Sequence, residues 1–172
     1  MSKSFVAVLI GSNNNLPIAK TTFTELKSLN ISFEARICSA HRTPEATRNF
    51  VEKAEKRGCA VFVAIAGLAA HLAGTVASYT IRPVIGVPIA TDNLGGLDAL
   101  LSTVQMPGGV PVACTTIGKA GAKNAALLAA QIIAIGNSTI SEKLRAKRAE
   151  IQNLIKSADE KLQAALHVEK HK

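Results

Sequence analysis

Short apolar runs alternate with longer segments of helical periodicity along most of this 172-residue chain. The apolar runs predict strands at 5–10, 33–38, 60–66, 84–87 and 110–114. The segments between and after them predict helices at 16–29, 44–57, 69–78, 97–104 and 120–135. Continuously apolar strands separated by helices are typical of a parallel sheet that is covered on both faces.

Right-handed crossover connections turn this alternation into a three-layer αβα fold. We therefore predict an α/β protein with a doubly wound parallel sheet of the flavodoxin-like or Rossmann-like kind. Such open sheets bind ligands beyond the carboxyl ends of their strands, where the strand order reverses. The loops that follow the first three strands are consequently the first places to look for a site.

Residues 137–172 form a C-terminal helical extension of the same domain, and 139–168 predict one long amphipathic helix. Its apolar side chains recur every seven residues, with two more at intermediate positions: Leu144, Ile151, Ala158, Ala165, Ile155 and Leu162. An apolar stripe of this length is normally buried against other protein surface. Packing on its own domain and packing on another subunit are equally compatible with the pattern, and a membrane-surface helix is less favoured.

Composition indicates an anionic partner. Lys and Arg number 20 against 12 Asp and Glu, which gives a net charge of +8. This balance suits nucleic acid, a membrane surface or a phosphorylated metabolite. The chain has five Phe, one Tyr and no Trp, too few to stack nucleic-acid bases on an aromatic platform. No block of like charges forms a basic arm or tail.

Cysteine content and hydropathy favour a soluble protein of the cytoplasm. The three cysteines are far apart and lack metal-ligand spacing, so we expect reduced, inert thiols. The run 5–10 is too short for a signal-peptide core. The most apolar later stretch, 125–135, is well short of the ~20 residues that cross a bilayer.

Polar and small residues follow each of the first three strands. The first loop has the sequence GSNNN at 11–15, whose glycine, hydroxyl and backbone amides suit a phosphate at a helix start. An ordinary turn rich in Gly, Ser and Asn is the alternative interpretation.

The second loop, SAHRTP at 39–44, concentrates three reactive side chains. Arg42 can bind a phosphate through two parallel hydrogen bonds, Ser39 can donate to the same group, and His41 can exchange a proton near neutral pH. The alternative is a capping turn, with Thr43 as N-cap of a helix whose first residue is proline.

The third loop, AGLAAHLAG at 66–74, is rich in small residues that let a ligand approach the backbone closely. His71 is the only polar side chain in this loop. A lone histidine in an apolar stretch is more often structural than functional. Its position beside the other two loops makes it a candidate for the site.

Taken together, these loops and several later segments resemble the class I N5-carboxyaminoimidazole ribonucleotide mutases of purine biosynthesis, the PurE family. The resemblance runs from Val6 to about Ile135 and rests on these segments: SAHRTP at 39–44, AAHL at 69–72, PVIGVP at 83–88, GLDALLS at 96–102, VQMP at 104–107, GVPVA at 109–113 and NAALLAA at 124–130. Related carboxylases that use free carbon dioxide typically have Lys where Arg42 stands.

The resemblance implies a fold, an activity and an assembly. Residues 1–136 would be the catalytic α/β domain of an isomerase that interconverts N5-carboxyaminoimidazole ribonucleotide and 4-carboxy-5-aminoimidazole ribonucleotide. The family assembles as a homo-octamer whose active sites are shared between subunits. No metal, nucleotide cofactor or biotin is expected, and neither nucleic acid nor membrane is an expected partner.

The resemblance also implies roles for individual residues. His41 would be the catalytic acid–base, and Ser12, Ser39 and Arg42 would hold the ribotide phosphate. The remaining expected substrate contacts are Asn15, Ala40, Gly67, Ala69, Ala70, His71 and Leu72. The segment Gly96–Pro107 would form a mobile or neighbour-contributed wall of the pocket.

Four positions depart from the family pattern. Asn14 and Asn15 stand where the family usually has Ser and a ribose-binding Asp, Leu68 replaces a glycine, and Ala73 replaces a proline. These departures keep two alternatives open. One is a member of the family that acts on another ribotide or heteroaromatic carboxylate, and the other is a non-enzymatic nucleotide-binding or nucleic-acid-binding module.

Overall fold

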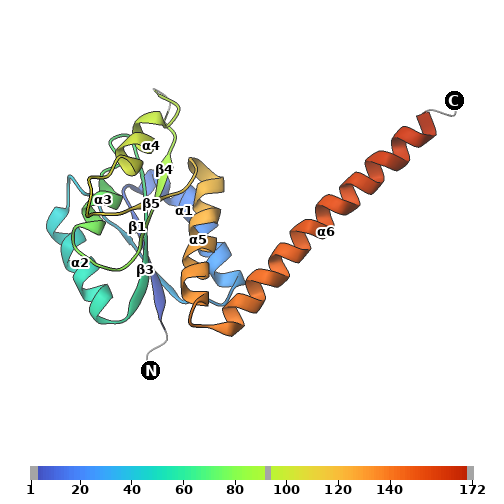
Figure 1. Ribbon diagram of the computed structural model, residues 1–172. Coiled ribbons are helices and arrows are strands. Elements are labelled where there is room, and N and C mark those ends of the chain that lie inside the picture. Colours follow the sequence, from blue (N-terminus) through green and yellow to red (C-terminus); the bar gives the residue numbers. More distant parts are fainter. Residues whose placement is uncertain (1–3, 92–93, 170–172) are drawn as a thin grey trace.

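The protein forms a five-stranded parallel sheet with helices on both faces, which confirms the predicted fold (Figure 1). The computed structural model describes residues 4–91 and 94–169. The strands lie in the order β2-β1-β3-β4-β5. Their bounds are β1 Phe5–Ile10, β2 Phe33–Ile37, β3 Cys59–Gly67, β4 Val84–Ile89 and β5 Ala113–Cys114.

Helices α1 and α5 cover one face of the sheet, and α2 and α3 cover the other (Figure 1). Helix α4 lies next to α3 and joins the second face. The bounds are α1 Leu16–Ser28, α2 Pro44–Lys56, α3 Leu72–Ala77, α4 Leu97–Val104, α5 Gly118–Ala134 and α6 Ser138–Glu169, with a short 3-10 helix, η1, at Asn13–Asn15.

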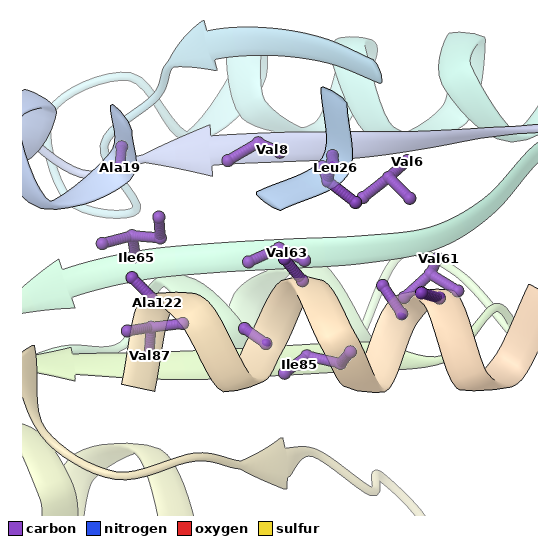
Figure 2. Close-up of a cluster of buried hydrophobic side chains, with 14 of the residues drawn as sticks. Val6, Val8, Ala19, Leu26, Val61, Val63, Ile65, Ile85, Val87 and Ala122 are labelled. Carbon is purple, nitrogen blue, oxygen red and sulfur yellow. The ribbon is translucent and has the colours of Figure 1, made fainter. Parts of the chain in front are cut away.

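Strand β1 shows why the apolar runs are continuous rather than alternating. All six of its residues are buried, and successive side chains of a strand point to opposite faces. Val6, Val8 and Ile10 pack in the cluster beneath α1 and α5, part of which Figure 2 shows. The other three, Phe5, Ala7 and Leu9, pack beneath α2 and α3. Each large side chain buried in this way contributes about 1.5–3 kcal/mol.

The register brings the ends of three neighbouring strands level with one another. Ile10, at the end of β1, pairs with Ile37 of β2 on one side and with Ile65 of β3 on the other. Because β2 and β3 flank β1, the strand order reverses here, and the loops after these three strands meet at one edge. This is the edge at which the sequence predicts a site.

Two elements begin three residues later in the structure than the sequence predicts. The strand predicted at 110–114 is reduced to Ala113–Cys114, because Gly109 has a positive φ and Pro111 has no N–H to donate to a neighbouring strand. The helix predicted from residue 69 begins at Leu72. The residues before it form a loop that carries part of the site.

Helix α6 packs on the domain only near its start. Ile140 is buried, and Leu144 packs against the cluster beneath α1 and α5. The Lys143 ammonium donates to the carbonyl of Leu29 at 3.4 Å, and Lys147 forms an ion pair with Glu25 of α1. The rest of the helix projects away from the sheet (Figure 1).

The projecting part of α6 carries exposed apolar side chains: Ile151, Leu154, Ile155, Leu162 and Leu166. Leu154 and Ile155 are 70% and 68% exposed. The first residues of the stripe therefore pack on the domain, and the later ones are exposed in the described chain. Over residues 4–91 and 94–169, no helix combines the length and apolar character needed to cross a membrane.

Candidate functional site

A cleft of about 610 Å³ lies at the carboxyl ends of β1, β2, β3 and β4. Most of the predicted site residues line it: Ser12, Asn15, Ser39, Ala40, His41, Arg42, Gly67, Ala69 and Leu72. Ala70 does not line the cleft because it is buried in the core beneath α2 and α3. His71 reaches the cleft indirectly, through its contact with His41.

The first loop is tied to β3 and presents polar groups to the cleft. The Gly11 amide donates to the carbonyl of Ile65 at 2.9 Å. Ser12 caps the 3-10 helix, because its hydroxyl oxygen accepts from the Asn14 amide at 3.3 Å. The Ser12 hydroxyl therefore keeps its proton free to donate to an anion. This 3-10 turn, which the sequence did not predict, lies directly before α1.

Arg42 connects the first and second loops. Its guanidinium donates to the Gly11 carbonyl at 3.4 Å and to the Ser39 hydroxyl at 3.4 Å. The Arg42 amide also donates to the Ser39 hydroxyl, at 3.2 Å. The structure thus brings a guanidinium and two serine hydroxyls, those of Ser12 and Ser39, to one end of the cleft.

Thr43 is the N-cap residue of α2 and Pro44 is the first helical residue, as predicted, but the Thr43 side chain makes no capping hydrogen bond. Its hydroxyl oxygen instead accepts from the Ser39 amide at 2.9 Å and donates to the Ser39 carbonyl at 3.2 Å. The hydroxyl is used inside the loop and is unavailable to the helix. As a result, Thr43 fixes the backbone of Ser39 beside the cleft.

His41 and His71 come together from two different loops. Nε2 of His41 lies 2.8 Å from Nδ1 of His71, and the ring planes meet at 85°. Two ring nitrogens at this distance share one hydrogen, so one ring donates it and the other accepts. Each ring thereby fixes the tautomer of the other, which suits a residue that must give and take a proton at a defined atom.

The third loop approaches the neighbouring strand very closely. A Cβ at Gly67 would lie 3.1 Å from the carbonyl oxygen of Ile89, so any larger residue would push the loop away from β4. Leu68, the next residue, has a φ of +57°. His71 then borders a second cleft of about 360 Å³, together with Leu101 and Met106.

Several residues of the cleft were not among the predicted site residues: Gly11, Asn14, Ala66, Leu68 and Thr91. The first four adjoin residues that were predicted. Thr91 follows β4 and comes from a loop without any recognisable motif. The rule that ligands bind beyond the carboxyl ends of parallel strands, applied to a fourth strand, would have found it.

The charge of the cleft favours an anion. Among the lining residues that the structure describes, Arg42 is the only Lys, Arg, Asp or Glu side chain. Cys38 precedes this loop, but burial raises the pKa of its thiol, which makes it a poor nucleophile. In the described part of the chain, no three His, Cys, Asp or Glu side chains are grouped so as to hold a metal ion.

Fold and cleft together define a doubly wound α/β protein whose cleft, at the switch point of the sheet, combines an arginine with a pair of histidines. The sequence model of the AIR carboxylase family matches residues 5–153 of this chain. The chain belongs to that family.

Named relatives agree with this assignment. N5-carboxyaminoimidazole ribonucleotide mutase of Saccharolobus solfataricus is 51% identical over 148 residues, which cover 86% of this chain and 92% of that protein. The mutase of Bacillus subtilis is 46% identical, with coverage of 90% and 96%. The crystal structure of Treponema denticola PurE matches with a TM-score of 0.84 at 30% identity, over 92% of this chain and 98% of that one.

Proposed function

We propose that this protein is an isomerase of purine biosynthesis that interconverts N5-carboxyaminoimidazole ribonucleotide and 4-carboxy-5-aminoimidazole ribonucleotide. One observation carries the proposal. Nε2 of His41 lies 2.8 Å from Nδ1 of His71, and His41 lines the same cleft as Arg42. The cleft thus has an acid–base group at one place and an anion-binding group at another. Relatives that match along most of the chain are named N5-carboxyaminoimidazole ribonucleotide mutase, which is the activity proposed for this protein.

The phosphate end of the substrate would bind between the first two loops. Arg42 supplies the positive charge, and Ser12 and Ser39 supply hydroxyl donors on either side of it. Hydrogen bonds to a charged group are stronger than neutral ones, about 1.5–3 kcal/mol each. Asn15, which lines the cleft at the end of the first loop, would contact the ribose. Ala40, Ala69 and Leu72 would line the space for the imidazole, and Ala70, which is buried in the core, would support them from behind.

The reaction then needs one proton carrier. The bond between the exocyclic nitrogen and the carboxylate breaks, carbon dioxide is released into the cleft, and the electron pair returns to the nitrogen, which takes a proton from His41. The ring carbon next attacks the carbon dioxide and loses its own proton to His41. Holding both reactants in one cleft replaces a bimolecular encounter. His71 keeps the His41 ring in the required orientation and tautomer.

The direct test is to incubate the purified protein with N5-carboxyaminoimidazole ribonucleotide and to follow the ring-carboxylated product by chromatography. We expect conversion without ATP or any added cofactor. Acid–base catalysis is worth about 10²–10⁴-fold, so His41→Asn should lower kcat by about 10³-fold while the circular dichroism spectrum stays unchanged. Absence of conversion by the wild type, or equal rates for the variant, would exclude the proposed function.

The assembly is part of the proposal. We propose a homo-octamer in which 1–136 form the catalytic domain and 137–172 extend it toward other subunits, with Gly96–Pro107 completing a neighbour's pocket. Exposed apolar residues along α6 support this arrangement, as do exposed side chains on α4: Leu97, Leu101 and Val104. Three unpaired cysteines agree with a reducing cytoplasm.

A further inference from the structure

Leu68 has a backbone conformation that leucine rarely adopts. Its φ is +57°, and among the described residues other than glycine only Asn30, with φ +58°, shares this feature. Asparagine visits the left-handed region readily because its side chain is short and polar. Leucine does so at a steric cost, because its Cβ crowds the following carbonyl oxygen.

The turn itself does not require leucine. Leu68 directly follows β3, and the chain then folds back through a tight turn in which the His71 amide donates to the Ala69 carbonyl at 2.8 Å. This turn delivers His71 to His41. Glycine or asparagine at position 68 would give the same backbone without the cost. Strain that is kept at a site points to a role for the side chain.

The Leu68 side chain is the main apolar surface that the cleft offers to a ligand. It lines the cleft and is 56% exposed. Among the described lining residues, the other apolar side chains are alanines or are buried, as Leu72 is at 2% exposure. Leu68 is therefore the largest exposed apolar side chain of the described lining and the group best able to exclude water from part of a bound molecule.

We propose that Leu68 covers the imidazole end of the bound ribotide and retains the carbon dioxide that is released between the two steps. This inference rests on the proposed function. Once the nitrogen–carboxylate bond has broken, the carbon dioxide either forms a bond with the ring carbon or escapes. An escaping molecule is hydrated to bicarbonate, and the enzyme is left with aminoimidazole ribonucleotide. An apolar cover favours the first outcome because carbon dioxide is uncharged and water is excluded.

Three variants separate the side chain from the strain. Leu68→Gly and Leu68→Asn both relieve the strained backbone. The asparagine side chain has the same number of heavy atoms as leucine but is polar. Leu68→Met keeps an apolar side chain. The assay measures aminoimidazole ribonucleotide and ring-carboxylated product in the same reaction, by chromatography, together with the thermal midpoint of each variant.

We expect Leu68→Gly and Leu68→Asn to raise both the thermal midpoint and the fraction of turnovers that end in aminoimidazole ribonucleotide, the latter by about tenfold. Leu68→Met should stay near wild type in that fraction. Asn30→Leu is the matched control, because it installs a strained leucine outside the cleft. It should lower the thermal midpoint and leave the product ratio unchanged.

The possible outcomes distinguish the two proposals. A wild type that converts the substrate, with product ratios and KM unchanged in Leu68→Gly and Leu68→Asn, would overturn the role of Leu68 and leave the enzyme activity standing. A wild type without any conversion would overturn the proposed function, and the role of Leu68 with it.

Discussion

The cleft and the projecting part of α6 differ in how their side chains are held. At the cleft, two functional side chains are held by another loop of the same chain: Arg42 by Gly11, and His41 by His71. Along α6, the apolar residues beyond Lys147 are exposed in the described chain. The cleft's guanidinium and imidazole groups are therefore held by contacts within one subunit, whereas α6 has an exposed apolar surface, which we propose packs on another subunit.

Disrupting the α6 surface should give the largest effect. Burial of two aliphatic side chains is worth about 1.5–3 kcal/mol each. The double variant Leu154→Glu and Ile155→Glu should therefore lose about 3–6 kcal/mol of association free energy per subunit and dissociate the proposed octamer. Light scattering in solution measures the mass, and circular dichroism checks the fold. Gln152→Glu and Asn153→Glu on the same helix form the matched control. An unchanged mass in the Leu154/Ile155 variant would show that this surface is not the assembly element.

The second prediction removes the Arg42 guanidinium from the cleft and leaves α6 unchanged. Arg42→Ala should lower kcat/KM for the ribotide by about 10–100-fold, because it removes charged hydrogen bonds worth about 1.5–3 kcal/mol. Most of the loss should lie in KM, and the mass in solution should stay that of the wild type. Arg48→Ala on α2, whose ion pair with Glu52 is exposed, serves as the control. If Arg42→Ala bound the ribotide as tightly as the wild type does, the phosphate would have to bind elsewhere.

The core beneath α2 and α3 gives a pH dependence. Burial raises the pKa of the Cys59 thiol to about 11 from its ordinary value of 9.0. A raised folded-state pKa stabilises the fold fully below pH 9, and this contribution is lost as the pH rises toward 11. The loss should total about 2–3 kcal/mol, measured by urea denaturation between pH 8 and 11, and it should be absent in Cys59→Ala. Equal alkaline losses in the two proteins would assign the effect to other groups.

The smallest expected effect concerns the ribose end of the cleft. Restoring a carboxylate with Asn15→Asp should strengthen hydrogen bonds to the ribose hydroxyls by about 1 kcal/mol, which lowers KM about fivefold. Asn13→Asp, in the same 3-10 helix but outside the cleft lining, controls for the added negative charge. Identical KM values for Asn15→Asp and the wild type would argue against a ribose contact at this position.

The sequence predicted those parts of the fold and site that depend on local pattern. Both ends of the strand at 5–10 were predicted correctly, because its residues are buried on both faces. Ser39 and Arg42 were recognised from their chemistry in one short segment. Features that depend on packing were missed. The Thr43 hydroxyl bonds within its own loop, and Thr91 reaches the cleft only because β4 lies beside β3.

The structure added what local patterns left open. Position 68 is the clearest example, because a leucine in the sequence says nothing about a positive φ until the tight turn before α3 is built. The contact between His41 and His71 likewise joins residues from separate loops. Periodicity predicted α6 correctly, but no pattern within one chain decides how much of its stripe packs on the same subunit.

The central claim, that one cleft both releases and recaptures the carboxyl group, is tested most directly with labelled substrate. The ribotide is prepared with carbon-13 in its carbamate carboxylate and converted in buffer that contains unlabelled bicarbonate. Mass spectrometry then measures the label in the ring-carboxylated product. Full retention of carbon-13 is the predicted result. A product whose carboxylate comes from the unlabelled bicarbonate would contradict the account, because the carbon dioxide would then have left the cleft.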